Sequence, residues 1–465
     1  KALGREEGTA AVMWVEDTPV FRGGKANQSG ERFPPAPGEP PTMSPNTRVH
    51  RLDNGIRLAT IAMPHMASVS MGIWAGAGSR HENEREHGMA HFVEHMLFKG
   101  SEERSAEEIS RHIESLGASI DGFTVEDHTA YQVKGPAEKF DRLFEVLSDL
   151  YCNPYLDPSE IDSEKQVIRE EIAMVHDQPS QYLDDLISEA AWGRDHPLGR
   201  SITGTEESLE RFRKAGIRAF HDRVYRGRHT VVSVAGRIDH DAVAASVAER
   251  LGDLAAGDDL PCDPAPPPLA QHRFHEDGGQ EQSHLALSFR NIDRNSPKRY
   301  AHKLLNVILG ENMSSRLFQV IREQRGLCYE VQSDLVSFAD AGALQIYLAL
   351  GAANLGEALR SISGILDDLR ARGVTATEME EAKSFVIGQN RISLENTSAQ
   401  MMWAGESLLY FNDWIDPEAA HRHLEAVTLA EIHEAAREAF DPDTLCTAII
   451  GTAESRSRLA QWLGR

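Results

Sequence analysis

The strongest chemical signal in the sequence is a short run of two histidines and an acid, His91-x-x-Glu94-His95. Residues four apart on an α-helix lie on one face, so His91 and His95 point the same way and can share one metal ion. Two imidazoles suit zinc. Glu94 borders that face, and a carboxylate beside a metal can take a proton from a bound water. The run therefore predicts a hydrolytic metal centre.

A polar, solvated helix surface would give the same five residues, and their neighbours bear on this alternative. Apolar side chains surround the polar trio at Phe92, Val93, Met96, Leu97 and Phe98. Such neighbours favour a buried site. The order H-x-x-E-H is the inverted form of the zincin motif.

A metal held by two histidines needs a further ligand, and a later stretch offers one. Asp157-Pro158 is typical of a helix start, and the predicted helix carries Glu164 and Glu171. These two acids are separated by about two helical turns and share a face. Glu171 is the better candidate for the missing oxygen ligand. The alternative for both acids is a charged helix surface.

The elements that must position these residues alternate between strands and helices. A hairpin is predicted over 48–61 and a strand over 68–74. The metal-binding helix is expected at 85–97, and a strand pair at 119–133. Helices are further predicted at 105–116, 139–151, 157–172, 205–222 and 240–251, with a strand at 230–235.

The second half of the chain repeats this order of elements. A shift of 218 residues places Ala382 on Glu164 and Gln389 on Glu171, so only the first copy can hold the metal. The sequence predicts an α+β protein with two homologous α/β-sandwich domains, each an antiparallel-rich sheet flanked by helices. The predicted units are an irregular extension (1–42), a metal-binding domain (43–258), a Pro-rich linker (259–271) and a metal-free domain (272–465).

Composition excludes several functions. The formal net charge of −24 over 465 residues argues against nucleic-acid binding and is compatible with basic peptides. No apolar run is long enough to span a membrane, so no membrane partner is expected. Four cysteines without a C-x-x-C pair fit a reducing compartment. We expect the cytoplasm, or an organelle matrix if the N-terminus is processed.

These stretches together resemble the pitrilysin-type (M16) metallopeptidases, which include insulysin and the mitochondrial processing peptidases. The resemblance covers residues 48–455. It rests on the run from His91 to His95, the Glu164/Glu171 pair, the loop His196–Thr205, and a second-half run from Met313 to Tyr329.

The resemblance implies a zinc-dependent endopeptidase with one Zn²⁺ per chain. His91, His95 and Glu171 would bind the metal, and Glu94 would act as the general base. Glu164 would orient the site by contacting its ligands, without binding the metal itself.

The resemblance also implies where a peptide binds. The edge strand near 118–124 would pair with it by strand addition, with Phe123 beside the scissile bond and Thr124 also contacting the substrate. Arg322 and Tyr329 would bind the substrate backbone or carbonyl.

One position departs from the family pattern. Asp127 stands where the family often has a Glu that supports a zinc histidine.

The chain length resembles the shorter, two-domain branch, in which two chains close as a clamshell around short or unfolded peptides. A homodimer is favoured because both the zinc set and the Arg322/Tyr329 pair occur in one chain, and a heterodimer is the alternative.

Three other functions are alternatives to a general peptide-cleaving enzyme. A dedicated maturation protease for one leader peptide would share the same chemistry. A non-catalytic structural subunit would carry a broken metal motif, which this chain does not. A zinc-storage module would leave Arg322 and Tyr329 without a role.

Overall fold

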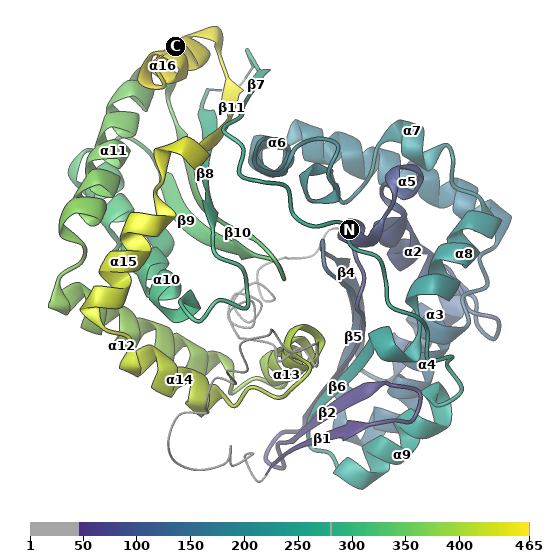
Figure 1. Ribbon diagram of the computed structural model, residues 1–465. Coiled ribbons are helices and arrows are strands. Elements are labelled where there is room, and N and C mark those ends of the chain that lie inside the picture. Colours follow the sequence, from purple (N-terminus) through teal and green to yellow (C-terminus); the bar gives the residue numbers. More distant parts are fainter. Residues whose placement is uncertain (1–45, 280, 465) are drawn as a thin grey trace, which may run out of the picture.

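Two mixed β-sheets organise the chain in the computed structural model, which describes residues 46–279 and 281–464 (Figure 1). The predicted extension 1–42 lies outside the described residues. The first sheet has the order β1-β2-β6-β3-β5-β4, formed by β1 (Thr47–Arg51), β2 (Arg57–Ala62), β3 (Ser68–Ala75), β4 (Ser119–Thr124), β5 (Thr129–Pro136) and β6 (Thr230–Gly236). The second has the order β7-β11-β8-β10-β9, formed by β7 (His272–Glu276), β8 (Ser283–Asn291), β9 (Glu330–Ser337), β10 (Gly342–Leu350) and β11 (Cys446–Gly451).

The two sheets share one topology over five strands, and the first sheet has β1 in addition. Each contains a single parallel pair, β2 with β6 and β7 with β11. All other neighbouring strands are antiparallel. From this pair outward, β6-β3-β5-β4 corresponds to β11-β8-β10-β9. The predicted fold class, with two homologous α/β units, is confirmed.

Helices flank both sheets. Those of the first half are α2 (Met89–Leu97), α3 (Ala106–Ser115), α4 (Phe140–Cys152), α5 (Pro158–Asp177), α6 (Pro179–Trp192), α7 (Glu206–Leu209), α8 (Lys214–Val224) and α9 (His240–Leu251). Those of the second half are α10 (Arg299–Asn306), α11 (Leu355–Arg372), α12 (Ala376–Ser393), α13 (Thr397–Phe411), α14 (Pro417–Ala426), α15 (Leu429–Ala439) and α16 (Ala453–Trp462). Within the described ranges, no helix has the length and apolar composition that a membrane span requires.

Three predicted helices differ from the structure, and one of them is α5, which continues to Asp177 past the predicted end at residue 172. The metal-binding helix begins at Met89 rather than near residue 85, because Gly88 before it adopts a left-handed backbone with φ 86°. The single helix predicted over 205–222 is wrong. It is broken between α7 and α8, where Arg213 is extended and the Phe212 ring packs 5.2 Å from that of Phe92.

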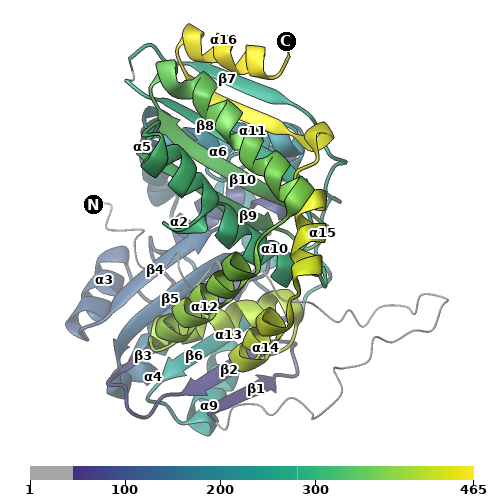
Figure 2. The same cartoon turned by 90° about the vertical axis from the view of Figure 1, so that its left-hand side faces the viewer.

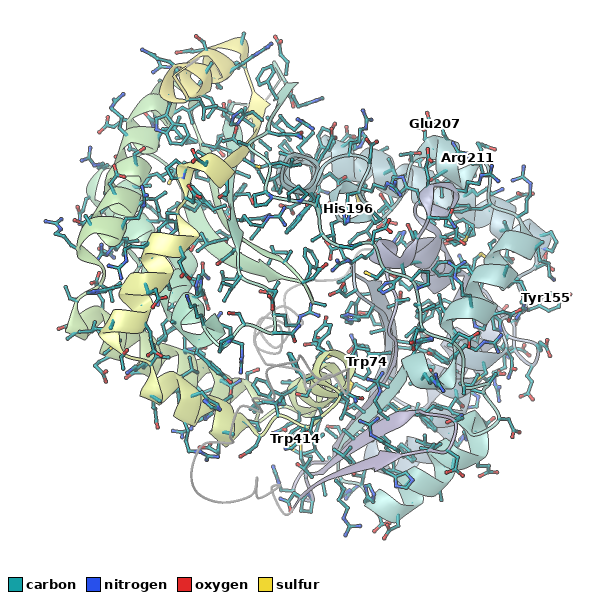
Figure 3. The ribbon with its side chains drawn as sticks, in the orientation of Figure 1. Trp74, Tyr155, His196, Glu207, Arg211 and Trp414 are labelled. Atoms are coloured by element: carbon teal, nitrogen blue, oxygen red, sulfur yellow. The ribbon has the colours of Figure 1, made fainter. Side chains whose placement is uncertain are left out.

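Each half lends one helix to the other half's sheet. Helix α13 covers the face of the first sheet that α2, α4 and α9 leave open, and α6 covers one face of the second sheet (Figures 1 and 2). Trp74 of β3 lies between the first sheet and α13 (Figure 3), and Gly405 leaves room for its ring. The domain limits drawn from the sequence stay predictions, since these helices cross between the sheets.

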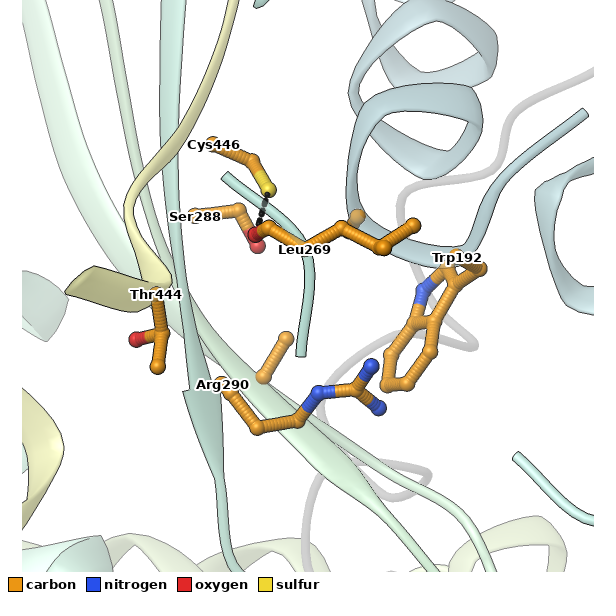
Figure 4. Close-up of a pocket in the computed structure, with 8 residues that line it drawn as sticks. Trp192, Leu269, Ser288, Arg290, Thr444 and Cys446 are labelled. Carbon is orange, nitrogen blue, oxygen red and sulfur yellow. Dashed lines mark hydrogen bonds between the residues drawn. The ribbon is translucent and has the colours of Figure 1, made fainter. Parts of the chain in front are cut away.

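The irregular segment between α9 and β7 is held by hydrogen bonds from the second sheet. The Arg290 guanidinium donates to the carbonyl of Pro266 over 2.8 Å and lies 4.0 Å from the Trp192 ring. The Cys446 thiol donates to the Leu269 carbonyl at 2.8 Å. These side chains line a small pocket between α6 and the second sheet (Figure 4). The linker is therefore packed into the structure rather than spanning a gap.

Buried ion pairs connect the halves close to the metal-binding helix. Arg80, which is 2% exposed, donates to both carboxylate oxygens of Asp340 at 2.7 and 2.8 Å. Asp127 lies 3.8 Å from Arg80 and 3.0 Å from Arg294. The Asp127 carboxylate, at the position where the family often has a supporting Glu, is therefore paired with two arginines.

Buried histidines predict a loss of stability in mild acid. Burial lowers the pKa of His128 to about 3 and that of His302 to about 4. An unfolded chain would protonate both near pH 6.5. Below that pH the unfolded state binds protons that the folded state does not, so the free energy of unfolding falls. The expected fall is about 1.4 kcal/mol per pH unit for each histidine, until its folded pKa is reached.

Urea unfolding between pH 7 and pH 4.5 measures this effect. His302→Leu should make the pH dependence shallower by about 1.4 kcal/mol per unit, and the same change at the exposed His50 is the control. An unchanged slope in His302→Leu would contradict the assignment.

Candidate metal centre

Helices α2 and α5 bring three predicted ligands together. His91 and His95 lie on α2, and Glu171 comes from α5. One ligand atom of each lies within 4.8 Å of the others. The Glu171 Oε2 atom is 3.7 Å from the Nε2 of His91 and 3.6 Å from the Nε2 of His95.

This donor set fits a zinc ion. Tetrahedral zinc with bonds of about 2.0–2.1 Å places its ligand atoms about 3.3 Å apart. The two nitrogen–oxygen distances exceed that value by only a few tenths of an ångström. The His91 side chain is 10% exposed, whereas those of His95 and Glu171 are 22% and 28% exposed, so the site opens to solvent beside His95 and Glu171.

Glu164 binds the side of the His95 imidazole that faces away from the other ligands. The His95 Nδ1 donates to Glu164 Oε1 at 2.8 Å, which leaves Nε2 as the metal-binding nitrogen. Lys99 pairs with the other carboxylate oxygen at 2.6 Å. Burial raises the pKa of Glu164, but His95 and Lys99 outweigh it, so the net pKa is lowered. Glu164 therefore stays ionised and orients the imidazole.

Glu94 lies beside the ligands in a nearly closed environment. It is 7% exposed, and the Thr124 hydroxyl donates to its Oε2 at 3.0 Å. Gly122 of β4 makes room for it, since a Cβ there would lie 3.1 Å from Glu94 Oε1 and 2.9 Å from Phe98. Burial raises the pKa of Glu94 to about 7, although His95 and Thr124 oppose the rise. A carboxyl group with that pKa can accept and release a proton near neutral pH.

A buried acid fixes the start of the metal-binding helix. The first turn of a helix has backbone N–H groups without helical partners, and Gly88 supplies no side-chain cap. Glu82 fills that role, accepting from the N–H groups of Gly88 and Ala90 at 2.8 and 2.6 Å. Gly88 also packs directly on Gly204, so the loop that ends at Thr205 supports the same helix end. His91 follows in this first turn.

We predict that Glu82→Gln weakens zinc binding about tenfold. Glu82 is 5% exposed, and a glutamine offers one acceptor oxygen where the two N–H groups need two. The displaced first turn would shift His91 relative to Glu171. Zinc affinity, measured by competition with a chromophoric chelator, tests this, with the exposed Glu84→Gln as control. Unchanged affinity in Glu82→Gln would show that the cap does not position the ligand.

The predicted substrate residues on β4 lie on its two faces. Thr124 contacts Glu94, on the side of the metal ligands. Phe123 faces the other way, where its ring meets that of His128 at 5.6 Å and packs against the core under α13. β4 is the edge of its sheet, with β5 as its neighbour there. The substrate roles of both residues stay predictions.

Arg322 and Tyr329 lie together in the second half. The Arg322 guanidinium is 5.0 Å from the centre of the Tyr329 ring, and Tyr329 is 76% exposed. Tyr329 directly precedes β9, in the opposite half from α2 and α5 (Figure 1). The structure therefore pairs these residues with each other, on the half that lacks the metal ligands.

Two residues that support the site, Lys99 and Glu82, were not predicted from the sequence. Lys99 follows His95 by four positions, a spacing that could have indicated a shared partner. Glu82 lies six residues before Gly88, the residue that precedes the helix, and no helix-capping pattern extends that far.

Comparisons with known proteins agree with this geometry. The insulinase domain (peptidase family M16) matches residues 57–206, and the peptidase M16 inactive domain matches residues 211–386. The uncharacterized zinc protease YmxG of Bacillus subtilis is 34% identical over 84% of this chain and 95% of its own length. An uncharacterized zinc protease of Mycobacterium tuberculosis is 33% identical over 89% of this chain and 94% of its own length.

Solved structures share the fold. A peptidase M16 inactive domain from Pseudomonas fluorescens superposes with a TM-score of 0.81 at 20% identity, covering 88% of this chain and 98% of that one. A protease from Helicobacter pylori gives 0.80 at 19% identity, covering 87% and 99%.

Proposed function

The chain belongs to the insulinase peptidases, family M16, and from that premise we propose that it is a zinc-dependent endopeptidase. The observation that carries the proposal is the convergence of His91, His95 and Glu171, with Glu94 beside them. The relatives named as zinc proteases support the same chemistry.

The residues around the metal have separate roles in peptide hydrolysis. A bound zinc ion would lower the pKa of a water molecule and polarise the peptide carbonyl. Glu94 takes the proton from the attacking water and delivers it to the leaving amine. Thr124 holds Oε2 of Glu94, so Oε1 is the oxygen that carries the proton. Glu164 keeps His95 in the metal-binding tautomer throughout.

The peptide is proposed to bind as an added strand on β4. This edge strand packs against α2 and carries Thr124 beside the base, so a peptide there runs past Glu94. Arg322 and Tyr329 would hold the substrate from the opposite half, either within one chain or from the second copy of a homodimer. Such a closed arrangement would admit short or unfolded peptides.

The test is cleavage of a mixed pool of unstructured peptides, with product masses recorded with and without a chelator. We expect cuts that a chelator abolishes and that added zinc restores. Cuts that persist in the chelator, from a protein shown to be free of metal, would rule out the proposal. A single cleaved sequence from a broad pool would instead favour a dedicated maturation protease.

A further inference from the structure

Helix α5 carries an unusual pair of exposed apolar side chains. Six large apolar residues are exposed among those that the structure describes, and two of them are Val167 and Met174, at 47% and 43%. The core-facing side of the same helix is made by Ile161, Ile168 and Ile172. Val167 and Met174 therefore belong to a second apolar flank that the fold itself does not cover.

This flank adjoins the metal site. At about 100° per residue, Val167 and Met174 lie within roughly 40–60° of Glu171 around the helix. Along the axis they bracket Glu171 at about 6 Å on one side and about 4.5 Å on the other. Glu171 Oε2 itself is 3.6 Å from His95 Nε2. A molecule that covers this flank therefore lies beside the metal centre.

We propose that Val167 and Met174 bind a large apolar side chain of the peptide next to the cleaved bond. This inference rests on the proposed function and names its substrate class: peptides with Leu, Phe, Met, Ile or Val beside the scissile bond. The pair spans about 10 Å of α5, the length of about three extended peptide residues.

A second copy of the chain is a poorer occupant of this flank. A stable interface buries about 800 Å² per partner, far more than two half-exposed side chains provide. A partner seated there permanently would also obstruct the metal site, since Glu171 forms part of its solvent-facing side. A peptide covers the flank only while it is being cleaved.

The internal repeat supplies a matched control. The shift of 218 residues that aligns the two halves places Ile392 of α12 on Met174 of α5. Ile392 is 64% exposed, and its helix carries Ala382 and Gln389 in place of the two glutamates. Ile392→Ser therefore removes the same kind of exposed side chain without touching the metal-binding half.

The experiment compares two peptides that differ only in Leu or Ala beside a mapped cleavage site. The ratio of their kcat/KM values is measured for the wild-type chain, for Ile392→Ser, and for Val167→Ser combined with Met174→Ser. We expect wild type and Ile392→Ser to prefer the Leu peptide about tenfold, and the double variant to lose most of that preference. Zinc content and mass in solution are measured for each protein.

The possible outcomes distinguish a failure of the apolar subsite from a failure of the proposed peptidase function. A preference retained by the double variant, or no preference in the wild type, would overturn the apolar subsite while leaving the peptidase intact. A double variant whose mass in solution falls relative to wild type would show that a second copy covers the flank instead. A wild-type chain with bound zinc that cleaves neither peptide, nor any peptide of a broad pool, would overturn the proposed function and this inference with it.

Discussion

Glu94→Gln is expected to lower kcat/KM for peptide cleavage by about 10³-fold while zinc stays bound. The substitution keeps the size of the side chain and the acceptor oxygen that Thr124 holds. It removes the ability to take a proton from water. Because Glu94 is 7% exposed, bulk water cannot easily replace it as the base. The rate and the zinc content of the same preparation are measured together.

The exposed Glu114→Gln on α3 is the control for loss of an acidic residue in this half. Full activity in Glu94→Gln, with one zinc per chain, would assign the proton transfer to another group. Loss of zinc together with activity would place Glu94 among the ligands instead.

Glu171→Gln is expected to abolish tight zinc binding and, with it, all chelator-sensitive cleavage. It gives position 171 the side chain that its counterpart Gln389 carries in the metal-free half. A neutral amide is a poor zinc ligand, and the two imidazoles alone hold the ion weakly. Removal of a hydrogen-bond partner of a metal ligand typically lowers zinc affinity about 10–100-fold, and removal of the ligand Glu171 itself should lower it further. Equilibrium dialysis with zinc buffers measures it.

Glu170→Gln is the matched control, because Glu170 is exposed and points away from the ligands one position earlier on the same helix. Stoichiometric zinc in Glu171→Gln under the same buffers would show that the third ligand lies elsewhere.

The sequence by itself determined the parts of this protein that depend on local spacing. The four-residue interval between His91 and His95, and the seven-residue interval between Glu164 and Glu171, fix which side chains share a helix face whatever the rest of the chain does. The repeated order of strands and helices likewise predicts two similar sheets. Each set of helices must bury its apolar faces against a sheet, so two sets of helices require two sheets. The grouping of His91, His95 and Glu171 agrees with the first prediction, and the shared strand order of the two sheets confirms the second.

The tertiary structure alone decided the contacts between distant segments. Asp127 could pair with a histidine or with arginines, and the fold brings Arg80 to it from the same half and Arg294 from the other half. The exchange of α6 and α13 between sheets follows from which faces remain uncovered after the local helices have packed. Glu82 reaches the start of α2 through a loop. Helical and strand periodicity reflects residues that are close in the sequence. These contacts join segments that are far apart in the sequence and depend on how the whole chain folds, so no local pattern predicts them.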